Sequence, residues 1–152
     1  MGPRLASSGL SEASAHACSL MVTGRAAQAF LGGTVAFFGA GDFSGQVSAQ
    51  DSATVHLLGA RQLATGQPGM GPVQNDVGSF GKLIVAEESG LQSQLFGTTN
   101  VVGFGRVLVL YESTLAGPIV CSGAGDAWID GTVIAGPGAA VTGCEHGMLP
   151  PP

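Results

Sequence analysis

Charged side chains are scarce in this chain of 152 residues. Asp, Glu, Lys and Arg make up only 10% of it, against roughly a quarter in an ordinary globular protein. The low charge, together with an apolar content of 45%, argues against a disordered chain, because disordered chains combine low hydrophobicity with high net charge. A folded surface with so few charges is expected to be neutral or to be covered by a neighbouring molecule.

Cations are the rarest of these charges: the chain has five, its net charge is -5 and its pI is about 4.8. They lie far apart in the sequence and form no basic stripe, so direct binding of nucleic acid is not expected. Gly, Ser or Asp interrupts every hydrophobic stretch, so no membrane-spanning helix is expected. Residues 1–21 also lack the continuous apolar core of a signal peptide. We therefore expect neither nucleic acid nor a membrane among the partners.

The chain has only three cysteines, at Cys18, Cys121 and Cys144. An odd number suits a reducing compartment better than a disulfide-stapled secreted domain, which indicates synthesis in the cytoplasm. His16 with Cys18, and Cys144 with His146, form mirrored pairs that would give a tetrahedral zinc site if the two ends met. The alternative is buried thiols and surface histidines, and the sequence leaves both readings open.

Glycine is abundant, at 26 residues, and the chain divides into parts of different amino-acid composition. Residues 1–33 are rich in Ala and Ser and predict an N-terminal arm with a short helix from Ser11 toward Leu20 and a further helical turn or two over 25–31. Residues 34–146 alternate apolar runs with turn residues and predict one all-β domain, with a long loop over 66–78. Residues 147–152 end in three prolines and predict an extended tail.

Internal repeats support the β prediction. TVAFFGAGDFSGQ from Thr34 matches TVHLLGARQLATGQ from Thr54, and FGKLIVAEESGL from Phe80 matches FGRVLVLYESTL from Phe104, including the Glu-Ser steps at Glu88 and Glu112. Repeats of this length are typical of a β-solenoid or of a sandwich or barrel of related hairpins. The second pair is spaced more widely than the first, and this irregularity leaves the choice open.

Two short segments resemble known families. GAGDA from Gly123 resembles the anion-hole signature of ribokinase-type sugar kinases, which implies that Asp126 acts as a base at the start of a helix. However, Gly131, Gly136 and Pro137 would break that helix, so we expect GAGD, which also occurs at Gly39, to form turns between strands. GKLIVAEES from Gly81 resembles bactofilins, which form self-polymerising β-solenoid filaments.

No catalytic constellation is visible. The chain has no GxSxG elbow, and His56 lies in an apolar alternation. Asp126 with Asp130 is one of many imaginable acid/base pairs, and the repeated Glu-Ser steps indicate a structural role. Trp128 and Tyr111 are each the only residue of their type and are expected in the core or an interface. We therefore expect no enzyme and no cofactor.

The sequence predicts a non-enzymatic structural protein of a larger assembly, a virion component that decorates or cements a phage-type capsid shell. Its partners would be protein subunits of that shell, and it would form a homo-oligomer, a trimer for example. The alternatives are a bactofilin-like cytoplasmic filament and a small ligand-binding or enzymatic β-barrel. The predicted assembly contacts lie in the arms and the loop, at Met1, Arg4, Gln67, Met70, Leu149, Pro150 and Pro152.

Overall fold

The computed structural model describes backbone strands within residues 13–16, 19–21, 27–30 and 34–43, and both backbone and side chains over 47–63 and 74–149. All regular elements of these residues are strands, and none is a helix. They are β1 (Ala13–His16), β2 (Ser19–Met21), β3 (Ala27–Phe30), β4 (Thr34–Phe43), β5 (Val47–Ala49), β6 (Thr54–Gln62), β7 (Gln74–Val77), β8 (Lys82–Ala86), β9 (Gln94–Leu95), β10 (Thr98–Val101), β11 (Arg106–Val109), β12 (Thr114–Leu115), β13 (Pro118–Cys121), β14 (Asp126–Ile129), β15 (Ile134–Ala135) and β16 (Ala140–Thr142).

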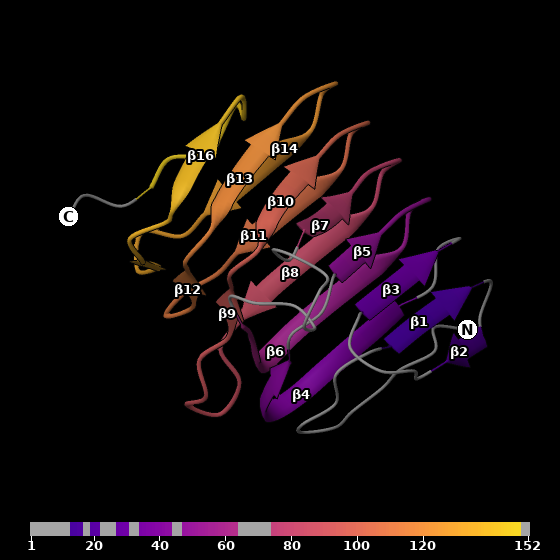
Figure 1. Ribbon diagram of the computed structural model, residues 1–152, viewed down its shortest axis with the longest axis horizontal. Coiled ribbons are helices and arrows are strands. Elements are labelled where there is room, and N and C mark those ends of the chain that lie inside the picture. Colours follow the sequence, from indigo (N-terminus) through magenta and orange to yellow (C-terminus); the bar gives the residue numbers. More distant parts are fainter. Residues whose placement is uncertain are drawn as a thin grey trace, which may run out of the picture.

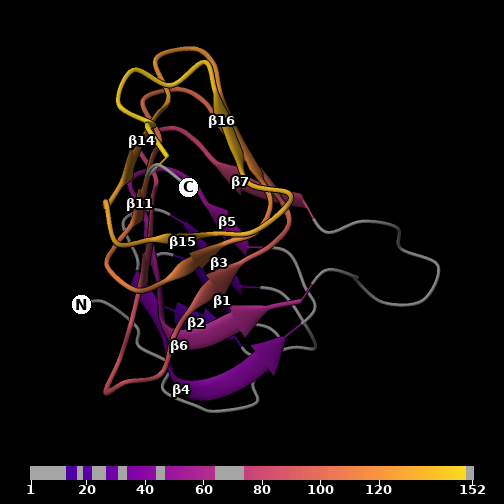
Figure 2. The same ribbon diagram turned by 90° about the vertical axis from the view of Figure 1, so that its left-hand side faces the viewer.

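The strands form a β-solenoid of about four turns. One face is a sheet in the order β16-β13-β10-β7-β5-β3-β1-β2, and β14, β11 and β8 stack on the second face. The long β6 spans two faces, because its first half pairs with β8 and its end pairs with β9, which leads to β12 and β15 on the third face. Figure 1 shows the stack from the side, and Figure 2 shows its roughly triangular outline along the long axis.

The strand register explains the uneven repeats. Thr34 pairs with Thr54, and Gln94 pairs with Thr114 at the same offset along the chain. Lys82 pairs with Arg106 at a longer offset, because the connection from β8 to β9 is longer than the matching connection from β11 to β12. The solenoid therefore has one basic period, that of the Thr34 repeat, with insertions at its corners.

This register corrects two details of the predicted repeats. Ser113 lies in line with Ser93 rather than Ser89, because Glu88 and Leu91 bridge to each other within the inserted residues. The Glu-Ser steps are therefore not equivalent positions. The loop predicted over 66–78 is also too long, because Gln74–Val77 form β7, while residues 64–73 lie outside the described part of the chain.

Four turns, at 50–53, 78–81, 102–105 and 122–125, lie one above another, and we call them the turn ladder. In each, the two central residues have positive φ and the fourth amide donates to the first carbonyl, which is a type I′ turn. The turns also bond to one another: the Ser52 amide donates to the Ser79 carbonyl at 2.9 Å, and the Phe80 amide to the Gly103 carbonyl at 3.0 Å. Each turn thus continues the sheet hydrogen bonding around a corner.

Close stacking of the last three of these turns requires glycine as the final turn residue. A Cβ placed on Gly105 would lie 2.6 Å from the Val77 carbonyl oxygen and 2.9 Å from that of Val102, both of them rigid backbone. The glycine of the repeated Phe-Gly-cation motif is therefore explained by the approach of two coils.

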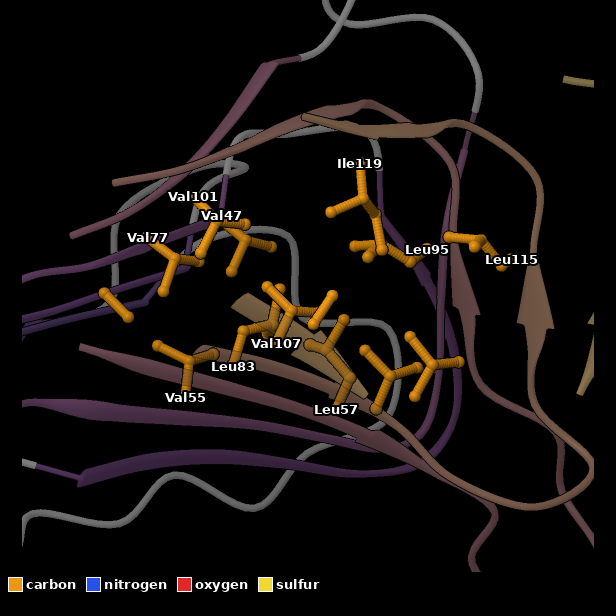
Figure 3. Close-up of a cluster of buried hydrophobic side chains, with 14 of the residues drawn as sticks. Val47, Val55, Leu57, Val77, Leu83, Leu95, Val101, Val107, Leu115 and Ile119 are labelled. Atoms are coloured by element: carbon orange, nitrogen blue, oxygen red, sulfur yellow. The ribbon is translucent and has the colours of Figure 1, made fainter. Parts of the chain in front are cut away.

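The interior is a continuous column of apolar side chains, and Figure 3 shows them pointing toward one another from the surrounding strands. It contains one polar network, in which Asn75 Nδ2 donates to Gln62 Oε1 at 3.0 Å and to Thr99 Oγ1 at 3.1 Å. Gln62 Oε1 also accepts the Gly97 amide at 2.9 Å. All three side chains are buried, so these hydrogen bonds replace those lost to water.

Other predictions concern the N-terminal segments. The helix expected from Ser11 toward Leu20 lies largely outside the described residues; its described parts, β1 and β2, are extended, and the remainder is untested. The helical turn expected over 25–31 coincides with β3. The GAGD copy at Gly39 is not a turn, because it lies within β4 at a shift of register between Phe38 and Gly41.

The register predicts opposite roles for the neighbours Leu83 and Ile84, since Leu83 is fully buried and Ile84 faces outward. Leu83→Ala should lower the free energy of unfolding by about 2–5 kcal/mol. Ile84→Ala should cost less than about 1.5 kcal/mol. Urea denaturation of both variants checks this, and equal losses would contradict the assigned faces.

Candidate functional site

A groove of about 400 Å³ lies near the C-terminal end of the solenoid, and we call it the C-terminal groove. The turn at 122–125 forms its floor, β14 contributes Asp126 and Trp128, and the segment after β16 contributes Glu145 and His146. Phe104 and Arg106, from the preceding coil, complete the lining. The groove thus combines aromatic rings with charges of both signs.

A disulfide between Cys121 and Cys144 holds the wall of the groove in place. Cys121 ends β13 and Cys144 follows β16, which pairs with β13 in the next coil, so the coil period brings the two sulfurs together. The expectation of free thiols is wrong for these two residues. The zinc hypothesis loses Cys144 as a ligand, while the side chains of His16 and Cys18 lie outside the described part.

Asp126 anchors the segment that carries His146. Its Oδ1 accepts the His146 amide at 3.0 Å and its Oδ2 contacts the ring Nδ1 of His146. Partial burial raises the pKa of Asp126, but the hydrogen bonds from His146 and from the Ala127 amide outweigh this effect, so the pKa lies below its usual value. The His146 ring stacks on Trp128 with centroids 3.9 Å apart.

The groove also holds a set of metal-ligating groups. Ligand atoms of Asp126, Glu145 and His146 all lie within 4.8 Å of one another. Two carboxylates and an imidazole are donors that Zn²⁺ and similar ions accept. Asp126 is, however, already engaged by both the backbone and the ring of His146.

Asp126 and Asp130 do not form the acid/base pair considered from the sequence, because each carboxylate is engaged by other groups. Asp130 Oδ1 accepts hydrogen bonds from the amide of Thr132 at 2.8 Å and from its hydroxyl at 2.6 Å. These bonds lower the pKa of Asp130 and fix the turn after β14. Its role is local and structural.

The kinase-like reading of GAGDA is also overturned. Gly123–Gly125 belong to the turn ladder and lead directly into β14, so no helix N-terminus faces them. The prediction of a turn between strands is confirmed at this copy.

A second feature lies along the turn ladder. Phe80 and Phe104 stack with ring centroids 5.1 Å apart and planes 7° from parallel, and they remain 64% and 57% exposed. Lys82 and Arg106 lie beside them in paired register, and within the described part of the chain no ion pair neutralises either cation. We call these four residues the aromatic ridge.

The backbone of the ridge is costly. Phe80 and Phe104 have φ of 64° and 62°, a region that costs a non-glycine residue about 1–2 kcal/mol. Burial of the rings does not offset that cost, because both are exposed. Both rings therefore lie exposed at positions whose backbone conformation favours glycine.

The predicted assembly contacts fall mostly outside the described residues: Met1, Arg4, Gln67, Met70, Pro150 and Pro152. Leu149 is described, and its side chain packs against the chain's own core cluster. Together with Val141 and Cys144 it covers the C-terminal end of that core. We call residues 143–149 the C-terminal cap.

Other surface features contribute less. A hollow of about 480 Å³ beside the inserted residues 88–91 has Arg61 as its one charged lining residue, and Arg61 already has an interaction partner. Tyr111 is exposed, and Trp128, at 46% exposure, lies on the surface rather than in the core. The C-terminal groove and the aromatic ridge are therefore the two candidate functional features of the described surface.

Comparison of the chain with protein-family models, with curated proteins and with solved structures finds no match. None of the described elements is a helix long and apolar enough to cross a membrane.

The disulfide predicts one free thiol per chain, that of Cys18, when the unreduced protein is unfolded and titrated with a thiol reagent. Replacing Cys121 and Cys144 by Ser should cost about 3 kcal/mol of unfolding free energy, because the bond closes a loop between residues 23 positions apart. A titre of three thiols would contradict the pairing.

Proposed function

We propose that this protein is a non-enzymatic structural component of a larger assembly, and that it decorates or cements the shell of a phage-type capsid. The observation that carries the proposal is the aromatic ridge, a pair of exposed stacked rings flanked by two cations on a rigid edge. Aromatic residues and Arg are enriched where proteins contact one another. We assign the ridge to contacts between copies and the predicted arms to the shell.

The rest of the surface supports a protein covered by neighbours. Several outward-facing sheet positions are uncharged: Thr98, Asn100, Pro118 and Val120 on one face, and Ile84, Leu108 and Trp128 on another, where they alternate with the charged Lys82, Arg106 and Asp126. Ile84, Leu108 and Trp128 lie in line across β8, β11 and β14. This uncharged column across three strands supports contact with a neighbouring molecule.

A bactofilin-like filament remains the alternative, and the solenoid architecture favours it over the small barrel, because this fold encloses no barrel. Filament growth requires coils to stack end on end in register. The C-terminal cap opposes such stacking, since Leu149 and the disulfide-linked Cys144 cover the terminal core. At the other end of its sheet, β2 pairs antiparallel with β1 and interrupts the parallel register. These features support lateral rather than axial contacts.

Light scattering and electron microscopy of purified protein test this proposal. We expect a closed oligomer, for example a trimer, whose mass does not grow with concentration. Combined Phe80→Ala and Phe104→Ala substitutions should dissociate it, whereas Tyr111→Ala, at an exposed aromatic outside the ridge, should leave it intact. Lengthening filaments, or an oligomer indifferent to loss of both rings, would refute the proposal.

A further inference from the structure

The C-terminal groove lies where a third aromatic ring would continue the stack of Phe80 and Phe104, at the equivalent position of the next coil. Phe80, Phe104 and Ala124 hold the same position in successive turns of the ladder, with φ of 64°, 62° and 65°. The Phe80 amide donates to the Gly103 carbonyl and the Phe104 amide to the Gly123 carbonyl, which confirms the alignment. The two phenyl rings stack along this line, and Ala124 offers only a methyl group below the second ring.

The spacing of the coils matches the spacing of stacked rings. Neighbouring strands are about 4.8 Å apart, and the two phenyl centroids are separated by a similar 5.1 Å. Phe104 and Ala124 both line the groove. A planar group one coil further along would continue the stack.

The charged side chains that line the groove determine which charge its ligand should carry. Glu145 is exposed, and no hydrogen bond or ion pair engages its carboxylate within the described residues. Asp126 also lines the groove, where the backbone and ring of His146 already engage its carboxylate. Arg106 also lines the groove, in register with Asp126 on the neighbouring strand, so Glu145 is the carboxylate left to pair with a cation.

We propose that the C-terminal groove is a binding site for a small aromatic amine, whose ring stacks on Phe104 above Ala124 and whose ammonium group pairs with Glu145. Trp128 and the ring of His146 form the side wall. The site shares Phe104 with the aromatic ridge, whereas Ala124, Glu145 and Trp128 lie outside the ridge.

Three matched probes test the proposal. Phenethylamine carries the ring and the cation, 2-cyclohexylethylamine keeps the cation without the aromatic face, and 3-phenylpropionate keeps the ring but reverses the charge. Trp128, the chain's only tryptophan, lines the groove and reports binding through its fluorescence. We expect phenethylamine to bind with a Kd of about 1 mM, the cyclohexyl amine about threefold to tenfold more weakly, and the propionate still more weakly.

Ala124→Phe is the decisive variant, because it fills the slot with a ring of the protein's own. The backbone accepts it, since Phe80 and Phe104 adopt the same left-handed conformation. Binding of phenethylamine should disappear in Ala124→Phe, weaken in Phe104→Ala and Glu145→Gln, and persist in Tyr111→Ala. Calorimetric titration, together with thermal unfolding to confirm that each variant is folded, gives the readout.

Two results would overturn the proposal: no response of wild-type protein to any of the three probes, or phenethylamine binding that survives unchanged in folded Ala124→Phe. If that variant unfolds, Phe104→Ala decides the matter, because loss of the platform must weaken the amine more than the cyclohexyl analogue. Equal binding of all three probes would likewise reject it.

Discussion

The parallel stacking of turns at one corner is the constraint on which the rest of this structure depends. Each turn of the ladder bonds to the next through backbone amides, so every coil must place its chain at the same point. That requirement fixes glycine as the last residue of three of the four turns, because a Cβ on Gly105, for example, would enter the backbone of the coil before it. It also permits insertions only at other corners, where residues 88–91 are accommodated.

Because of that constraint, side chains at equivalent positions of successive coils line up in columns. Both candidate functional features are built on such columns. The aromatic ridge exists because two consecutive coils carry the Phe-Gly-cation motif in register. The C-terminal groove exists because the next coil replaces Phe by Ala124 and the cation by Asp126. The same Asp126 then binds His146 and seats the C-terminal cap. The groove of this solenoid therefore lies where one coil carries different side chains at the positions that the preceding coils repeat.

The all-β body and the repeat offsets were predictable, because period and turn residues are local signals: the Thr34 and Phe80 repeats correspond to β4 with β6 and β8 with β11. The choice of a solenoid was not, since corner insertions hide its basic period. The disulfide was missed because Cys121 and Cys144 meet only through pairing of β13 with β16. The groove was missed for the same reason, although the motif Phe-Gly-Lys, Phe-Gly-Arg, Ala-Gly-Asp was a usable signal. The proposed shell contacts remain predictions.

Hydrogen exchange at the turn ladder tests the account most directly. In an isolated type I′ hairpin the second central amide has no partner across the turn, whereas here the Ser52 and Phe80 amides each donate to the adjacent coil. The account predicts that these two amides exchange as slowly as those of β6 and β8. Rapid exchange at both positions beside protected strands would show separate hairpins and would contradict the stacked coil.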